Sequence, residues 1–166
     1  QDVPYRGCLY VGLMIDSEGA PGVIEFNVRF GDPETQVTVP LISSDLAELL
    51  LACAEGRVSD AEVDFQSHSA ATVVLASEGY PASSATGRII SGSEIEIEEG
   101  EVRGFVHYAG TNFDAEGNLV SSGGRVLSAT GTAPDLSGAV GAAYGVIDCI
   151  GLEGSHYRSD IAYRAF

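Results

Sequence analysis

Three polar side chains alternate along residues 23–30, and their types suit the transfer of a phosphoryl group. Apolar and polar residues alternate strictly here, so a β-strand would place Glu25, Asn27 and Arg29 on one face. Carboxylate and amide oxygens are ligands that Mg²⁺ takes, usually together with phosphate oxygens of a nucleotide. The planar guanidinium group of an arginine suits a carboxylate or a phosphoryl group. The opposite face would carry the apolar side chains Ile24, Phe26, Val28 and Phe30.

The pattern alone leaves two interpretations open. Glu-x-Asn-x-Arg is also typical of an exposed strand face without any function, and that is the more common origin of such a pattern. The motifs around this strand are needed to distinguish a functional site from an exposed strand face without function.

The first third of the chain predicts a β-hairpin followed by a helix. An apolar run over 8–15 and the alternating run over 23–30 are separated by turn residues, which indicates two paired strands. Asp45 is the predicted helix N-cap, with Glu48 placed as in a capping box, and Gly56 is placed to end the helix. The apolar stripe of this helix is expected to cover the sheet as core: Leu46, Leu49, Leu50 and Cys53.

The rest of the chain is richer in strands. β-branched and aromatic residues predict four strands, at Ser69–Ala76, Arg88–Ser91, Val102–Ala109 and Arg125–Thr130. A second helix is predicted over 135–150, with Leu136, Val140, Tyr144 and Ile147 on one face, although its three glycines disfavour a helix. The sequence thus predicts the α+β class, with two parts, 1–62 and 63–166.

Composition excludes several classes of function. The formal net charge is −16, and all 8 basic residues are arginines, so binding to nucleic acids or to an anionic membrane surface is not expected. The acidity indicates a well-solvated surface; adaptation to high salt is a second hypothesis, which equal stability in low and molar salt would exclude. Cys8, Cys53 and Cys149 are odd in number and far apart, which favours reduced thiols and a cytoplasmic protein. No apolar run is long enough to span a bilayer.

A set of motifs in a fixed order gives the strongest indication of function. The polar strand runs directly into Arg29-Phe30-Gly31-Asp32-Pro33-Glu34, and further segments precede and follow it. Together they resemble the phosphoribosylamine–glycine ligases of the ATP-grasp superfamily over nearly the whole chain. The other matching segments are Gly7–Met14, Ser44–Leu46, Gly79–Pro81, His107–Thr111, Ser122–Leu127 and Tyr157–Ala165.

The resemblance implies a fold and an activity. It implies the C-terminal part of an ATP-grasp domain, made of antiparallel strands and a helix, then a small, mainly β C-terminal domain with a flanking helix. Such ligases join glycine to 5-phosphoribosylamine, with ATP as co-substrate, through glycyl phosphate in purine biosynthesis. Glu25 and Asn27 would then hold Mg²⁺ or Mn²⁺, Arg29 would be catalytic, and Gly31 and Asp32 would line the substrate pocket.

A second substrate contact is implied at Gly123, Gly124 and Arg125. Glycines allow backbone N–H groups to approach an anion, and the neighbouring arginine can complete a phosphate site. By the resemblance, Arg125 would bind the 5-phosphate of the ribose. A glycine bulge followed by an arginine that faces solvent is the equally weighted alternative.

The resemblance covers less than half of such an enzyme. The N-terminal domain and the larger part of the ATP-grasp domain, which hold the nucleotide, are not in this sequence. We therefore expect this chain alone to bind nucleotide poorly and to be inactive. Two alternatives remain: a non-catalytic binding module derived from the C-terminal region, and another ATP-grasp ligase of the purine pathway.

Overall fold

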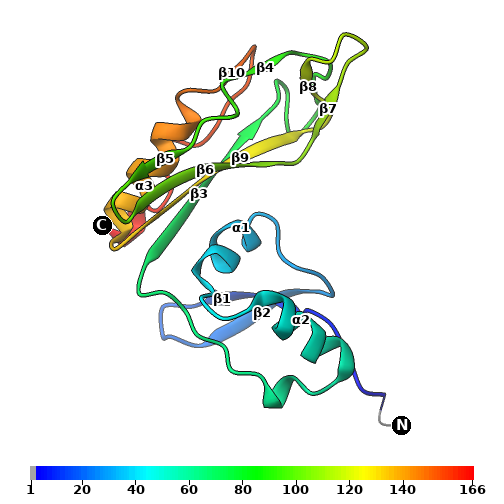
Figure 1. The fold of residues 1–166 in the computed structure, drawn as a ribbon, viewed down its shortest axis with the longest axis vertical. Helices are drawn as coiled ribbons and strands as arrows, with labels where there is room; N and C mark the ends of the chain where they lie inside the picture. Colours follow the sequence, from blue (N-terminus) through cyan, green and yellow to red (C-terminus); the bar gives the residue numbers. More distant parts are fainter. Residues whose placement is uncertain (1–2) are drawn as a thin grey trace. The chain divides into compact units, whose positions relative to one another are not determined.

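The chain forms two compact units, each with its own strands and helices (Figure 1). In the computed structural model, which describes residues 3–166, the units are Gln1–Gln66 and Ser67–Phe166. The sequence predicts the boundary after residue 62, close to this division. Helices and antiparallel strands occur in both units, so the predicted α+β class is confirmed.

The first unit begins with the predicted hairpin. Strand β1 (Tyr10–Ile15) pairs antiparallel with β2 (Pro21–Asn27), and Tyr10 lies opposite Asn27. A register shift after Gly12 leaves one extra residue in β2, which is a β-bulge just before Glu25. The predicted extension of β2 to Phe30 is wrong, because the chain bends after Asn27 and leads into the short helices α1 (Thr35–Thr38) and η1 (Val39–Leu41).

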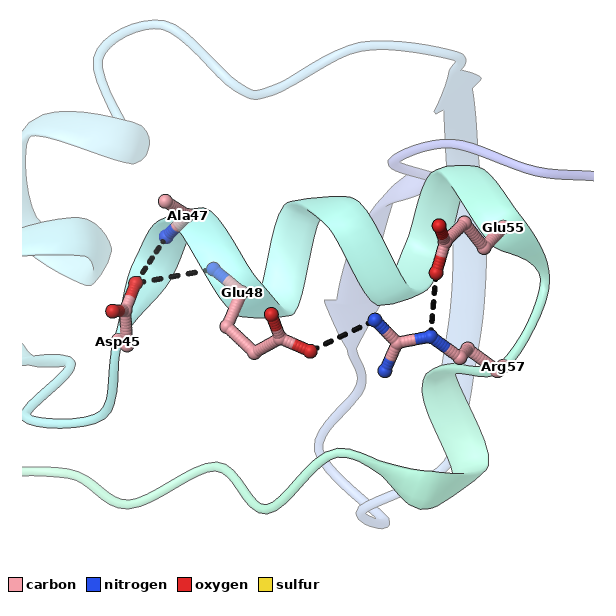
Figure 2. A network of polar contacts seen from close by, with 5 residues as sticks. All are labelled: Asp45, Ala47, Glu48, Glu55 and Arg57. Carbon is pink, nitrogen blue, oxygen red and sulfur yellow. Dashed lines mark hydrogen bonds and ion pairs between the residues drawn. The ribbon is translucent and has the colours of Figure 1, made fainter.

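Helix α2 (Leu46–Glu55) begins and ends at the predicted residues (Figure 2). The carboxylate of Asp45 accepts hydrogen bonds from the backbone N–H groups of Ala47 and Glu48, at 2.9 and 3.1 Å. Gly56 closes the helix in the left-handed conformation, with φ of 77°. The capping box is incomplete, since the Glu48 carboxylate accepts from Arg57 Nη2 at 2.8 Å and does not turn back to the N-cap.

The apolar stripe of α2 is less buried than the sequence predicts. Ala52 is the buried residue of this helix, whereas in the predicted stripe Leu50 is 44% exposed and Leu46, Leu49 and Cys53 are only half-buried. The expectation that the stripe would be core is therefore wrong in part. A unit of this size has too few elements to cover every apolar side chain. The short helix η2 (Val58–Asp60) follows α2.

The second unit is built on one antiparallel sheet. Its strand order is β3-β9-β6-β5. The strands are β3 (Ser69–Ala76), β5 (Ile97–Glu99), β6 (Val102–Tyr108) and β9 (Arg125–Ala133). Two small ribbons pair β4 (Ile90–Ser91) with β10 (Gly151–Leu152), and β7 (Thr111–Phe113) with β8 (Leu119–Ser121). A 3-10 turn, η3 (Tyr163–Ala165), lies near the end. The four predicted strands are present; the sequence analysis did not predict β5, β7, β8 and β10.

Helix α3 (Leu136–Ile147) packs on the sheet where two glycines lie opposite each other. Gly104 in β6 pairs with Gly131 in β9. A Cβ on Gly131 would lie 2.7 Å from the backbone nitrogen of Ala143, and a Cβ on Gly104 would lie 3.1 Å from the carbonyl oxygen of Ala142. The helix backbone therefore lies almost directly on the strands.

This close approach changes which face of α3 is buried. The buried residues are mostly small: Ala139, Ala142, Ala143, Val146 and Ile147. Of the predicted face, Ile147 is buried, whereas Leu136, Val140 and Tyr144 are only partly buried. Large side chains could not fit between a helix and a sheet that are this close. No helix within residues 3–166 is long and apolar enough to cross a membrane.

Candidate metal and substrate site

Glu25 and Asn27 lie together on one face of β2, as the sequence predicts. The side-chain nitrogen of Asn27 lies 3.0 Å from a carboxylate oxygen of Glu25. Glu25 is exposed and Asn27 is half-buried, so neither is enclosed in apolar packing. Tyr10 pairs with Asn27 and Gly12 pairs with Glu25 in β1, and the second pair borders the β-bulge, so strand pairing holds the backbone of both residues.

This pair fits a divalent cation. A rotation of the Asn27 amide about its terminal bond would place its oxygen beside the Glu25 carboxylate, giving two oxygen ligands. Within the described part of the chain, no group of three or more His, Cys, Asp or Glu side chains is arranged to hold a metal. The pair would thus supply only part of a coordination shell, as is usual for Mg²⁺, which keeps waters and phosphate oxygens.

Arg29 lies beyond the end of the strand. It is exposed in the bend after β2, and its Nη1 donates to the carbonyl oxygen of Phe30 at 2.8 Å. The conformation of the bend therefore determines where this guanidinium group lies, whereas the strand pairing determines the positions of Glu25 and Asn27.

Tyr10 and Glu34 join the site, although the sequence analysis gave neither a role. The Tyr10 hydroxyl donates to Glu34 Oε1 at 3.2 Å. This hydrogen bond, together with the negative charges of Glu34 and Glu25, raises the pKa of Tyr10, while the positive charge of Arg29 lowers it. The hydroxyl therefore lies within electrostatic reach of both the carboxylate and the guanidinium group of the predicted site. Tyr10 lies opposite Asn27 because of the hairpin register, which the alternation of apolar and polar residues does not specify.

Gly31 and Asp32 have different surroundings. Gly31 is buried, and a Cβ there would lie 2.9 Å from Cβ of Glu34, so a larger residue would displace the Glu34 side chain. Asp32 is exposed and accepts a hydrogen bond from Gln36 Nε2 at 2.9 Å. Asp32 thus helps to shape the turn before α1, while the Glu34 carboxylate reaches the hairpin.

Gly123, Gly124 and Arg125 belong to the second unit. A Cβ on Gly124 would lie 2.9 Å from Cε2 of Tyr80 and 2.9 Å from Oγ of Ser84, so this glycine allows close packing of the loop that contains Tyr80. Arg125 is exposed and begins β9 beside a register shift between β3 and β9. The extra residue at this register shift is Val126, which follows Arg125, so the shift is not the glycine bulge of the alternative interpretation.

A separate cavity in the second unit contains none of the predicted site residues. Its volume is about 750 Å³. The lining is mainly apolar and includes Ile90, Tyr108, Phe113, Leu119 and Cys149. The cavity holds no cluster of charged groups that would suit a phosphorylated substrate.

Comparison with models of protein families shows which family the chain belongs to. The model described as phosphoribosylglycinamide synthetase, C domain, matches residues 70–164, which is more than half of the chain. The chain belongs to the phosphoribosylglycinamide synthetase family. The model of the ATP-grasp (A) domain of the same synthetase matches residues 1–35, which include the Glu25–Asn27 pair.

Individual relatives agree with the synthetase family. The phosphoribosylamine–glycine ligase of Mycobacterium leprae is 49% identical over 163 residues, which are 98% of this chain and 36% of that protein. A crystal structure of the Thermotoga maritima phosphoribosylamine–glycine ligase matches with a TM-score of 0.75 and 36% identity, covering 92% of this chain and 36% of that one. The chain thus spans about a third of the length of these synthetases.

A more distant structure shares the fold alone. The biotin carboxylase domain of the Hydrogenobacter thermophilus 2-oxoglutarate carboxylase matches with a TM-score of 0.55 at 18% identity, covering 92% of this chain and 33% of that one. The predicted fold is therefore confirmed: the chain has the fold of the C-terminal part of an ATP-grasp ligase.

Proposed function

We propose that this chain is the part of a phosphoribosylamine–glycine ligase that carries its metal ligands and part of its substrate pocket. The whole enzyme would join glycine to 5-phosphoribosylamine at the expense of ATP, in purine biosynthesis. The observation that carries this proposal is the contact between Glu25 and Asn27 on an accessible strand face, inside the segment that matches the ATP-grasp domain model. The named function of the relatives supports it.

The reaction has two steps in this proposal. A carboxylate oxygen of glycine takes the γ-phosphoryl group of ATP, which gives glycyl phosphate and ADP. The amine of 5-phosphoribosylamine then attacks the acyl carbon, phosphate leaves, and the amine loses a proton. Bound Mg²⁺ or Mn²⁺ would neutralise phosphate charge during the first step.

The residues of the first unit act by position and charge. Glu25 and Asn27 would hold the cation, which would neutralise charge on the nucleotide phosphates, and Arg29 stabilises the charge that develops on the acyl phosphate. Gly31 and Asp32 line the pocket. None of these residues has to exchange a proton with the substrate. The first unit therefore contributes to catalysis through the arrangement of its charges.

The second unit contributes to substrate binding. Gly123 and Gly124 line the phosphate site, Gly124 allows the loop of Tyr80 to pack closely, and Arg125 binds the 5-phosphate of 5-phosphoribosylamine through charge-assisted hydrogen bonds. The rest of the ligase supplies the remaining nucleotide contacts, so this chain alone binds nucleotide poorly and is inactive. The three free thiols are consistent with a cytoplasmic enzyme.

A chimeric enzyme tests the function. The matching segment of the Thermotoga maritima ligase is replaced by this chain, and formation of ADP is measured with glycine and 5-phosphoribosylamine. We expect ADP formation that needs both substrates, and a large loss of activity in Glu25→Gln but not in Glu18→Gln, which changes an exposed glutamate in the hairpin turn. A folded chimera without activity would contradict the proposal.

The role of Arg125 is tested in the same enzyme. Arg125→Ala should raise KM for 5-phosphoribosylamine by about tenfold or more, since hydrogen bonds to a charged group contribute roughly 1.5–3 kcal/mol. Arg103→Ala, which removes an exposed arginine from the neighbouring strand β6, is the matched control. An unchanged KM in Arg125→Ala would remove the assignment.

A further inference from the structure

The contact between Tyr10 and Glu34 connects two parts of the site that are fixed in different ways. Glu25 and Asn27 belong to β2, whose pairing with β1 holds them in place. Arg29 lies after the last residue of β2, in the bend that leads to Gly31. Strand pairing therefore does not control the position of Arg29 relative to the other two side chains.

Glu34 stabilises the far end of this bend. Its Oε1 accepts the hydrogen bond from Tyr10, a contact across 24 residues of sequence. Its side chain also fills the space beside Gly31, where a Cβ would lie 2.9 Å from Glu34 Cβ and 3.1 Å from Glu34 Cδ. The bend is thus held between β2 at one end and the Tyr10 hydroxyl at the other.

We propose that Tyr10 is a positioning residue: its hydrogen bond to Glu34 holds the bend over residues 28–34 and thereby orients Arg29 toward the Glu25–Asn27 pair. The hydrogen bond from Tyr10 holds the Glu34 carboxylate against the hairpin. The functional consequence for Arg29 rests on the proposed ligase activity, whereas the effect on its conformation does not.

The proposal predicts that two properties respond differently to loss of the hydroxyl. Cation binding depends on groups that the strand pairing holds, so it should persist in Tyr10→Phe. The contribution of Arg29 depends on the bend, so it should be lost. A residue that only stabilises the fold would affect both properties together.

The first arm of the test uses this chain by itself. The NMR resonance of the Arg29 Nε–H group is compared in the unchanged chain, in Tyr10→Phe and in Tyr5→Phe. Tyr5 is the matched control, since its hydroxyl donates to the carbonyl oxygen of Cys8 at 2.8 Å in the same unit. We expect the Arg29 resonance to shift in Tyr10→Phe and not in Tyr5→Phe, while Mn²⁺ still broadens the Asn27 side-chain amide in all three.

The second arm uses the chimeric ligase. Tyr10→Phe should lower kcat by about tenfold to a hundredfold, the effect of misplacing a catalytic group by about 1 Å, with KM for Mg-ATP changed by less than about twofold. Glu34→Gln keeps an oxygen acceptor but loses the charge, so it should have a smaller effect and provides a second variant if Tyr10→Phe folds poorly.

The outcomes separate this proposal from the proposed function. An unchanged Arg29 resonance with unchanged kcat would overturn the positioning role, and so would equal loss of cation binding and of the Arg29 signal. If the unsubstituted chimera is inactive, the proposed function fails, and the NMR comparison on this chain still decides whether Tyr10 orients Arg29.

Discussion

Gly104 and Gly131 lie opposite each other on β6 and β9, and helix α3 packs against the surface that their missing side chains leave. Because the helix backbone approaches to within van der Waals contact of both strands, the alanines of α3 can fill the space without larger side chains. The glycines of the sheet and the small residues of the helix thus pack directly against each other. This packing supports β9, the strand that begins with Arg125.

Gly131→Ala should destabilise the chain. The added Cβ would lie 2.7 Å from the Ala143 nitrogen, so the helix must move, and overpacking of this kind costs about 1–3 kcal/mol. Gly141→Ala is the control within α3, because no atom beyond the adjoining backbone of the helix lies within 4 Å of the added Cβ and alanine favours a helix by about 1 kcal/mol. Urea denaturation followed by circular dichroism should show opposite shifts of the midpoint. Equal shifts in the two variants would show that the close approach of α3 to the sheet does not prevent a side chain at Gly131.

Asp45→Ala should lower the stability of the first unit by about 1 kcal/mol, because the N-cap carboxylate bonds two backbone N–H groups of α2. Asp45→Asn keeps a side-chain oxygen at the same place and should have little effect. Both variants can be compared by chemical denaturation of the chain. If Asn is as destabilising as Ala, the stabilisation comes from charge and not from the cap geometry in Figure 2.

The stability that the turn between β7 and β8 contributes should decrease at acid pH. The Asn118 side chain donates a hydrogen bond to Asp114, and backbone N–H groups do so as well, which lowers the pKa of Asp114. A carboxyl group with a depressed pKa in the folded state stabilises the fold above its ordinary pKa of about 3.9, and this contribution disappears as pH falls through the lower folded value. NMR titration should place the Asp114 midpoint below that of an unstructured aspartate. A midpoint at the ordinary value would contradict the observed bonds.

Much of the architecture could be predicted from sequence, because local signals determine it. Asp45 and Gly56 have the residue types that begin and end helices, and β3 coincides with its run of β-branched residues. The end of β2 could not be predicted, since the apolar alternation continues to Phe30 although the chain bends after Asn27. The buried face of α3 was missed because it depends on glycines in two strands that are distant in sequence.

One part of the candidate site could be predicted from the sequence, and another part could not. Alternation along one strand was sufficient to place Glu25 and Asn27 side by side. The contact between Tyr10 and Glu34 depends on strand register and on the course of the bend, which alternation does not specify. The role of Glu34 was therefore missed, although it belongs to the motif that carries the family resemblance.

The central claim is that Glu25 and Asn27 bind a divalent cation, and paramagnetic broadening by Mn²⁺ tests it most directly. In this chain, Asn118 provides an internal control, because its side chain contacts the Asp114 carboxylate at 2.9 Å much as Asn27 contacts Glu25. We predict that Mn²⁺ broadens the Asn27 side-chain amide at concentrations that leave Asn118 sharp, and that Glu25→Gln raises the required concentration by about tenfold, equivalent to about 1.4 kcal/mol. Equal broadening of Asn27 and Asn118, or no effect of Glu25→Gln, would contradict the claim.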